Sequence, residues 1–276
     1  MVTRAAPSWA GLPTDRPLVM GILNVTPDSF SDGGVWDDPV AAIAAARAML
    51  RAGADIIDIG GESTRPGALE TPPELERERI LPVIRAMARM DAAISVDTRH
   101  ADTMRAALDA GARIVNDVSG FCFDPAAAPL MRARGCAVVA MHMRGVPATM
   151  RQLADYDDVA ADVVCELERS LRQLGLERAL VAVDPGIGFA KGPGHNEALL
   201  ARLPILLNLG CRIVVGASRK GFIGRLGGVE SPGDRLPGSL AAGIAAVLGG
   251  AAVLRVHDVA ATVQALHVWQ GIVAAA

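Results

Sequence analysis

The sequence predicts a single (β/α)8 barrel, and three observations lead to that fold class. The 276-residue chain is 51% hydrophobic, which is enough for a large core. Eight short apolar runs occur along it, each followed by a helical stretch, and each run ends in polar residues. Barrels of ~250 residues are routinely one domain. We therefore expect residues 18–276 to form the barrel and residues 1–17, with three prolines, to form an irregular lead-in.

Five of the expected strands share a pattern of helix tail, glycine and apolar run. The stretches are RAMLRAGADIIDIGGES, RAALDAGARIVNDVSG, LMRARGCAVVAMHM, LLNLGCRIVVGASRK and AVLGGAAVLRVHDV. The glycine suits the position just after a helix, where a positive φ is needed. The Val- and Ile-rich run suits a parallel strand that is buried on both faces. Three more strands, at 18–25, 92–98 and 179–186, lack the glycine signal but have the same composition.

The helical stretches between these runs complete the alternation. We expect helices at 38–52, 74–90, 99–110, 125–135, 156–175, 195–209, 235–249 and 259–272. Eightfold strand–helix alternation over this length favours the barrel. An open doubly wound sheet is the alternative, but it would more often carry a GxGxxG after its first strand, and none is present.

Composition excludes several classes of partner. The formal net charge is −3 and no block of Lys or Arg occurs, so we expect neither nucleic acid nor an anionic membrane surface as a partner. The uncharged stretch 236–254 is long enough for a membrane span. It is broken by Gly249 and Gly250, so a buried helix followed by a strand explains it better. Four cysteines without a CxxC pair, and no apolar leader, predict a cytoplasmic protein.

Polar residues stand at the end of every expected strand, where the working groups of a barrel lie. They are Asn24, Asp58, Asp97, Asn116, Asp117, His142, Asp184, Ser218, Arg219, Lys220, Arg255, His257 and Asp258. Any one of them could be a helix cap or a turn residue, since those positions use the same residue types. Because all eight strand ends carry polar side chains, the sequence predicts a binding cleft at this end of the barrel.

Part of the chemistry of this cleft can be predicted. Asp97, Asn116 and Asp184 place acceptors at the mouth of an apolar barrel and suit a flat heterocycle with several N–H donors. No Walker A sequence occurs, so an ATPase is not indicated. Any metal should be an oxygen-ligated Mg²⁺ tied to a phosphate.

Positive charge comes from Lys220, Arg255 and His257. Arg255 and His257 are two residues apart on one expected strand, so they should face the same way and suit an anion such as a phosphate. The alternative for each is a salt bridge to a neighbouring aspartate.

Several long motifs, all in order, resemble the bacterial dihydropteroate synthase family from about Leu18 to Gly271. They are ILNVTPDSFSDGG, DIIDIGGESTRPGA, ISVDT, IVNDVSG, MHMRGVPATM, DPGIGFAKGPGHN, GASRKGFIG, PGSLAA and RVHDV. The resemblance implies a (β/α)8 barrel that is typically a homodimer. It also implies a transferase of folate biosynthesis, in which 4-aminobenzoate displaces pyrophosphate from 6-hydroxymethyl-7,8-dihydropterin diphosphate to give 7,8-dihydropteroate. In the family the C–O bond breaks early to leave a cationic pterin methylene, and sulfonamides compete for the aminobenzoate pocket.

Site roles carry over by motif. The resemblance implies pterin binding by Asp97, Asn116, Asp184, Lys220 and Phe189. It implies diphosphate binding by Asn24, Arg255 and His257, with Asn24 also helping to hold Mg²⁺ against the leaving pyrophosphate. A buried carboxylate such as Asp97 would favour the developing cation.

Two loops match the segments that, in the family, close over substrate and build the aminobenzoate site. They are residues 24–34 and 61–67. The implied aminobenzoate residues are Phe30, Thr64, Arg65, Pro66, Phe189, Ser218 and Lys220, and Asp32 lies where the family has a carboxylate near the incoming amine. We expect Asp97, Lys220, Asp32 and Arg65 to act in catalysis, and Asp58, Asp117 and His142 to have supporting structural roles.

Two rival functions differ from this interpretation. A pterin-dependent methyltransferase shares the barrel but needs neither a diphosphate site nor an aminobenzoate loop. A pterin-binding paralogue without synthase activity would keep the fold and the pterin site.

Overall fold

The chain folds as a closed barrel of eight parallel strands, paired in sequence order β1 to β8 and back to β1. The computed structural model describes residues 9–13, 15–26, 39–63 and 70–275. The strands are β1 Leu18–Asn24, β2 Ile56–Gly60, β3 Ala93–Asp97, β4 Ile114–Asp117, β5 Ala137–Met141, β6 Val181–Asp184, β7 Arg212–Val215 and β8 Val253–Val256. The predicted barrel is confirmed, and each strand predicted by range ends within two residues of its expected bounds.

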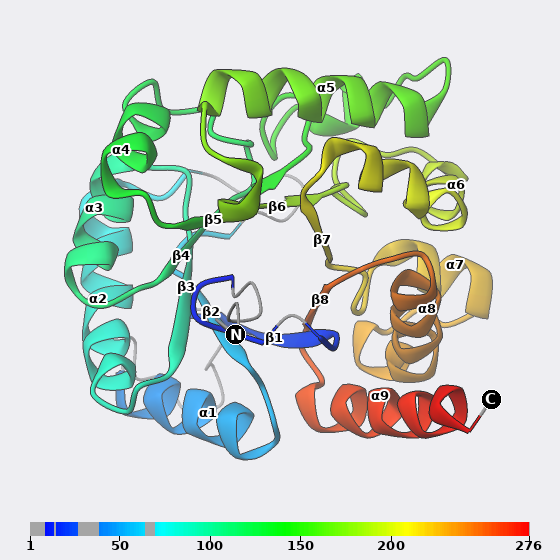
Figure 1. Ribbon diagram of the computed structural model, residues 1–276, viewed down its shortest axis with the longest axis horizontal. Helices are drawn as coiled ribbons and strands as arrows, with labels where there is room; N and C mark the ends of the chain where they lie inside the picture. The colour runs from blue at the N-terminus through cyan, green and yellow to red at the C-terminus, as the bar shows by residue number, and fades with distance from the viewer. Residues whose placement is uncertain (1–8, 14, 27–38, 64–69, 276) are drawn as a thin grey trace, which may run out of the picture.

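Helices ring the strands on the outside (Figure 1). They are α1 Pro39–Arg51, α2 Pro73–Ala88, α3 Ala101–Asp109, α4 Ala127–Arg134, α5 Val159–Leu174, α6 His195–Ala201, α7 Gly221–Gly227, α8 Leu236–Leu248 and α9 Val259–Ala274. Two differ from the sequence prediction. Helix α7 was not expected, and the predicted helix 195–209 divides into α6 and a 3-10 helix, Leu203–Leu209. Pro204 explains the break, because proline lacks a backbone N–H and clashes within a helix.

The glycines predicted to follow helices do adopt left-handed backbone. Positive φ angles occur at all five positions, Gly53, Gly111, Gly135, Gly210 and Gly250. The requirement is strictest at Gly111, where φ is +113° and an added Cβ would lie 2.6 Å from the Cβ of Ala88. This turn therefore tolerates only glycine without rearrangement.

Strand residues alternate between two apolar cores. In β2, Ile57 and Ile59 pack outward under the helices, whereas Ile56 belongs to a second cluster inside the barrel. This alternation is the two-residue period of a strand. Near the amino-terminal end of the barrel both faces of the strands are apolar, which is why their sequences are nearly continuous hydrophobic runs.

The inner cluster closes the amino-terminal end of the barrel. Trp9, from the lead-in, is 1% exposed and packs with inward-facing residues of the strands, such as Met20 and Val253. Its indole N–H donates to the carbonyl of Leu180 at 3.2 Å. Trp9, in the described part of the lead-in, therefore forms the floor of the barrel.

Among the described residues, no helix is long and apolar enough to cross a membrane. The uncharged stretch 236–254 comprises α8, a glycine turn and the first two residues of β8, in agreement with the predicted helix followed by a strand.

Candidate active site at the mouth of the barrel

Polar residues at the carboxyl ends of the strands continue the inward-facing rows. Along β8, Val253 lies in the inner cluster and Arg255 follows two residues later on the same face. Asp58 follows Ile56 in the same way in β2, and Asp97 ends β3 on the inner face. The barrel thus directs side chains from distant parts of the sequence into one mouth.

Arg255 is the centre of this mouth. Its Nε donates to Asp58 Oδ2 and its Nη2 to Asp97 Oδ2, each at 2.6 Å. Asn116 Nδ2 donates to the same Asp58 oxygen at 3.1 Å. The salt-bridge alternative considered for Arg255 is therefore what the structure contains. Within the described part of the chain, the buried Asp58 Oδ1 has no hydrogen-bond partner, so an acceptor remains for a bound molecule.

Burial shifts the pKa of the ionisable groups around Arg255. Burial raises the pKa of Asp97 to about 7, against the attraction of Arg255. It also raises the pKa of Asp184 and lowers that of Lys220 to about 8. The pKa of Arg255 moves upward, because Asp58 and Asp97 outweigh the effect of burial. Two of these groups therefore titrate near neutral pH, a pattern that often marks a functional site.

Lys220 and Phe189 form an adjoining wall of the mouth. The ammonium of Lys220 lies 4.0 Å from the centroid of the Phe189 ring, within cation–π range. Gly188 has φ +83°, and an added Cβ would lie 2.9 Å from Lys220 Cδ, so the backbone passes close under the lysine stem. Asp184 accepts from the N–H of Gly186 at 2.7 Å, which fixes the carboxylate at the end of β6.

His257 differs from expectation in two respects. Strand β8 ends at Val256, so His257 lies just beyond it, although its ring still faces Ser218. Nδ1 of His257 and Oγ of Ser218 are 3.1 Å apart. Burial, Arg219 and Arg255 lower the pKa of His257 to about 4. This pKa favours a neutral, hydrogen-bonding ring over the positive charge that the sequence predicted for His257.

Asn24 ends β1 at the rim and is partly exposed. The other residues expected from the two loops, Phe30, Asp32, Thr64, Arg65 and Pro66, lie outside the described residues. The described residues thus bring together Asp97, Asn116, Asp184, Lys220, Phe189, Ser218, Arg255 and His257 at one end of the barrel, with Asn24 at its rim.

Sequence reasoning missed a buried ion pair beside the mouth. Arg99 donates to both carboxylate oxygens of Glu62, at 2.9 and 3.0 Å, and both side chains are 4% exposed. Glu62 also accepts from the N–H of Thr71 at 3.0 Å. The pair joins the end of β2 to the start of the β3–α3 connection. The sequence contained no signal for it, because its partners are 37 residues apart.

The donors present fit a Mg²⁺ ion that arrives with a phosphate-bearing substrate. Within the described ranges, no group of three His, Cys, Asp or Glu side chains is arranged to hold a metal ion. Mg²⁺ commonly keeps several waters and is bound by one or two protein oxygens plus substrate phosphates. The amide oxygen of Asn24 at the rim can be one such ligand.

Comparison with known proteins is consistent with this geometry. A family model described as pterin binding enzyme matches residues 20–257. The chain belongs to the pterin-binding enzyme family. It is 48% identical over 259 residues to a dihydropteroate synthase of Mycobacterium leprae, covering 91% of each chain. The expected family is thus confirmed.

Solved structures of pterin-binding enzymes share the fold closely. A Xanthomonas albilineans dihydropteroate synthase with 4-aminobenzoic acid has a TM-score of 0.88 and 46% identity, covering 95% of this chain and 96% of that one. A Yersinia pestis dihydropteroate synthase in a sulfonamide drug complex has a TM-score of 0.89 and 40% identity, covering 95% and 96%. The chain therefore groups with the dihydropteroate synthases, which are transferases.

Proposed function

We propose that the chain condenses 6-hydroxymethyl-7,8-dihydropterin diphosphate with 4-aminobenzoate to give 7,8-dihydropteroate and pyrophosphate. The observation that carries this proposal is the network of Arg255 with Asp58 and Asp97 at the mouth of the barrel. In it the partly buried guanidinium of Arg255 lies beside the partly buried carboxylate of Asp97, which supports a diphosphate site next to a group that would stabilise a developing pterin cation.

The pterin ring is proposed to bind between Asp97, Asn116, Asp184 and Lys220. The acids and the amide can accept from the N–H groups of the ring, because buried donors need partners. Asp97 is also placed to stabilise positive charge at the pterin methylene when the C–O bond breaks. Its pKa of about 7 leaves much of it ionised at neutral pH.

The diphosphate is proposed to bind Arg255, His257 and Asn24. Arg255 contributes the charge, and His257 contributes a hydrogen bond from a neutral ring. Asn24 would hold Mg²⁺, which offsets negative charge on the leaving pyrophosphate when bound.

The aminobenzoate is proposed to bind against Phe189, Lys220 and Ser218. The ring of Phe189 and the ammonium of Lys220 form one wall, which suits an aromatic carboxylate. Phe30, Thr64, Arg65 and Pro66, with Asp32 near the amine, are assigned to this site from their motifs alone. Because the Yersinia relative is a sulfonamide complex, we propose that sulfonamides compete here as well.

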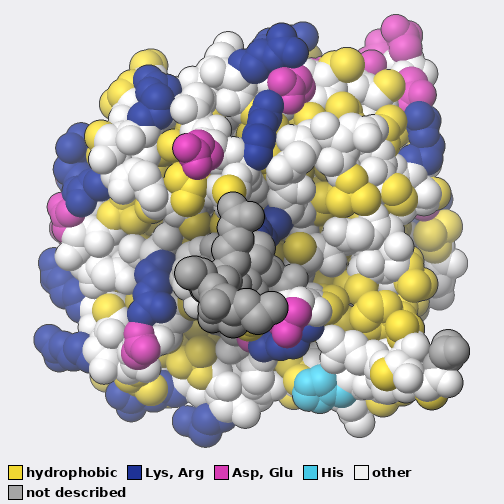
Figure 2. Space-filling model, viewed as in Figure 1, with side chains coloured by type: hydrophobic (Ala, Val, Ile, Leu, Met, Phe, Trp, Pro, Cys, Tyr) yellow, Lys and Arg dark blue, Asp and Glu magenta, His cyan; other side chains and the backbone are white. Residues whose placement is uncertain are grey.

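A second copy of the chain is the proposed partner in a homodimer. Several large apolar side chains of α8 and α9 are exposed, among them Leu248 at 69% and Ile272 at 67%. Figure 2 shows apolar side chains gathered over this part of the molecule. Exposed apolar surface of this kind marks interaction sites.

The free cysteines, two of them exposed, support the proposal of a reducing, cytoplasmic location.

Pyrophosphate release tests the function. Purified protein with pterin diphosphate, 4-aminobenzoate and Mg²⁺ should release pyrophosphate, and dihydropteroate should appear in equal amount. Omitting 4-aminobenzoate is the control. Pterin binding without release would favour the inactive paralogue, and methyl transfer from a methylated folate would favour the methyltransferase.

A further inference from the structure

The backbone around Phe189 is held by two side chains, Lys191 two residues further along the chain and Tyr156 from the connection that precedes α5. Lys191 Nζ donates to the carbonyl of Phe189 at 2.9 Å, and the hydroxyl of Tyr156 donates to the next carbonyl, that of Ala190, at 2.8 Å. Ala190 has φ +45°, a conformation that a non-glycine residue adopts only when its surroundings hold it there. Two consecutive carbonyls are thus fixed beside the mouth.

Lys191 is itself part of a buried relay. Its Nζ lies 2.9 Å from Nδ1 of His142, and Nε2 of His142 lies 3.0 Å from Glu166 Oε2. Burial lowers the pKa of Lys191 to about 7, so a large share of it is an ammonium at neutral pH. In that form it can only donate, so Nδ1 accepts and the His142 proton is on Nε2, facing the carboxylate. Burial, together with Lys191 and Arg144, lowers the pKa of His142, in agreement with a neutral ring. Lys191 therefore donates both to His142 and to the Phe189 carbonyl, and His142 donates onward to Glu166.

The chain of hydrogen bonds from Lys191 through His142 to Glu166 is held by residues of β5, α5 and the connection between them. Arg144 pairs with Glu166 and its guanidinium lies 3.8 Å from the ring centroid of Tyr156. His142 follows β5 and Glu166 lies in α5, so both belong to the rigid frame of the barrel. Among the described residues, Lys191 hydrogen-bonds to His142 and to the Phe189 carbonyl, and its charge also acts on Asp184, which helps to keep the pKa of that carboxyl lower than burial alone would leave it.

The Phe189 carbonyl belongs to the residue whose ring packs against Lys220 at the mouth of the barrel. The ring of Phe189 lies 4.0 Å from the ammonium of Lys220, and Gly188 passes close under the lysine stem. A shift of the Phe189 backbone would therefore move both the aromatic wall and the lysine that lies over it. Displacements of about 1 Å at such a wall can change rates by ~100-fold.

We propose that Lys191 is a positioning residue for the aminobenzoate half of the reaction: through the carbonyl of Phe189 it sets the Phe189 ring against Lys220. The inference rests on the proposed function, in which this wall receives 4-aminobenzoate. In this proposal Lys191 does not touch a substrate itself. It acts on the reaction only through the position of Phe189.

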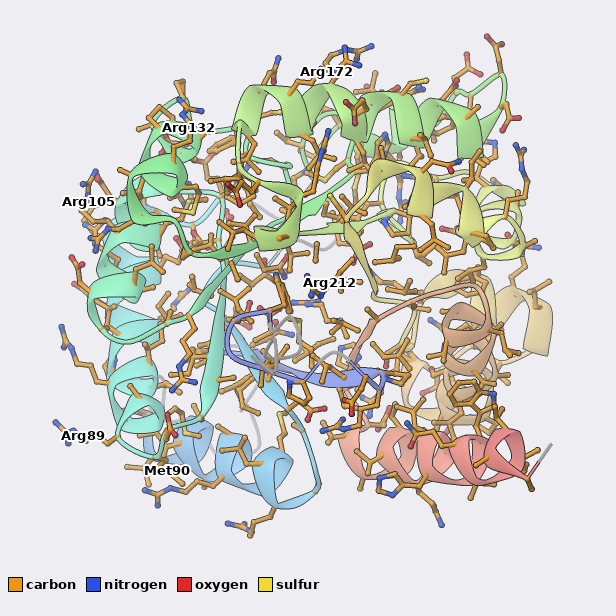
Figure 3. All side chains as sticks on the ribbon, in the orientation of Figure 1. Arg89, Met90, Arg105, Arg132, Arg172 and Arg212 are labelled. Carbon is orange, nitrogen blue, oxygen red and sulfur yellow. The ribbon has the colours of Figure 1, made fainter. Side chains whose placement is uncertain are left out.

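Three variants separate positioning from general structural damage. Lys191→Met keeps the length of the stem and removes the donors. Lys191→Arg restores charged donors. Arg172→Met is the matched control, because Arg172 is 76% exposed and projects outward from α5 (Figure 3). For each protein, steady-state kinetics give kcat and separate KM values for the two substrates, and thermal unfolding gives the stability.

The expected result is a selective effect on one substrate. In Lys191→Met the KM for 4-aminobenzoate rises about tenfold, because the Phe189 wall loses the bond that sets it and displacements of about 1 Å at such a wall cost up to ~100-fold. The KM for pterin diphosphate stays within about threefold, Lys191→Arg recovers most of the loss, and Arg172→Met matches the parent protein.

Other results overturn the inference. Unchanged kinetics in Lys191→Met, or an equal rise in both KM values with no recovery by Lys191→Arg, would show that Lys191 only stabilises the fold. If Lys191→Met does not fold, Tyr156→Phe decides, because loss of its bond to Ala190 should raise the same KM by a smaller factor. Failure of the proposed function is distinguishable, because the parent protein would then release no pyrophosphate.

Discussion

Asp97→Asn should make the protein more stable and much less active. The two side chains have the same shape, so the variant removes charge and little else. Burial raises the pKa of Asp97 from 3.8 to about 7. An acid with a raised folded-state pKa destabilises the fold progressively as pH rises from 3.8 to about 7. A shift of about three units corresponds to up to about 4 kcal/mol at pH 8, where the parent carboxylate is ionised and the variant is neutral.

The loss of activity has a separate origin. A buried group that stabilises charge in a transition state contributes ~3–4 kcal/mol, so kcat should fall by about 100- to 1000-fold. Urea unfolding at pH 5 and pH 8 measures stability, and pyrophosphate release measures kcat. Asp102→Asn, on the exposed face of α3, is the control. A variant that is less stable than the parent at pH 8, or that keeps a tenth of the parent kcat, would refute the reasoning.

Three further predictions follow from the same charges and from the floor of the barrel. The profile of kcat/KM should peak between pH 7 and 8, since Asp97 is protonated below about 7 and Lys220 loses its proton above about 8; a flat profile from pH 5.5 to 9.5 contradicts this. The ring of His257, with a pKa of about 4, should not titrate between pH 5.5 and 8 in NMR spectra, and a midpoint near 6.5 would show that it is less buried than in this structure. Trp9→Ala should lower the free energy of unfolding by ~3–5 kcal/mol, as for other buried tryptophans, with KM values within about twofold; a loss below 1 kcal/mol would mean that the floor is not needed.

Much of the fold could be predicted because its signals are local. The Val- and Ile-rich runs, and the glycines that precede five of them, lie within a few residues of the elements they define, so the strands could be placed closely. Helix α7 was missed because its seven residues, GFIGRLG, contain three glycines and show no helical periodicity. Pro204 is also a local signal, and it accounts for the break within the predicted helix 195–209.

The site was predictable as a set of residues but not as a set of charges. Strand ends converge in a barrel, so Asp97, Asn116 and Arg255 could be expected in one mouth. Their pairing could not, because Arg255 is 158 residues from Asp97 and 197 from Asp58. The neutrality of His257 and the role of Lys191 likewise depend on burial among side chains from other strands, which no spacing reveals.

The ion pairs of Arg255 with Asp58 and Asp97 affect which anions the mouth of the barrel binds. A guanidinium that is already satisfied by two internal carboxylates attracts stray anions weakly, so ambient phosphate gains little by entering. Under the proposed function, an incoming diphosphate would exchange with these carboxylates, and each exchange would release acceptors for the pterin ring that the diphosphate carries. Occupation of one half of the cavity would in this way prepare the other, and departure of pyrophosphate would let the bridge re-form and reset the enzyme.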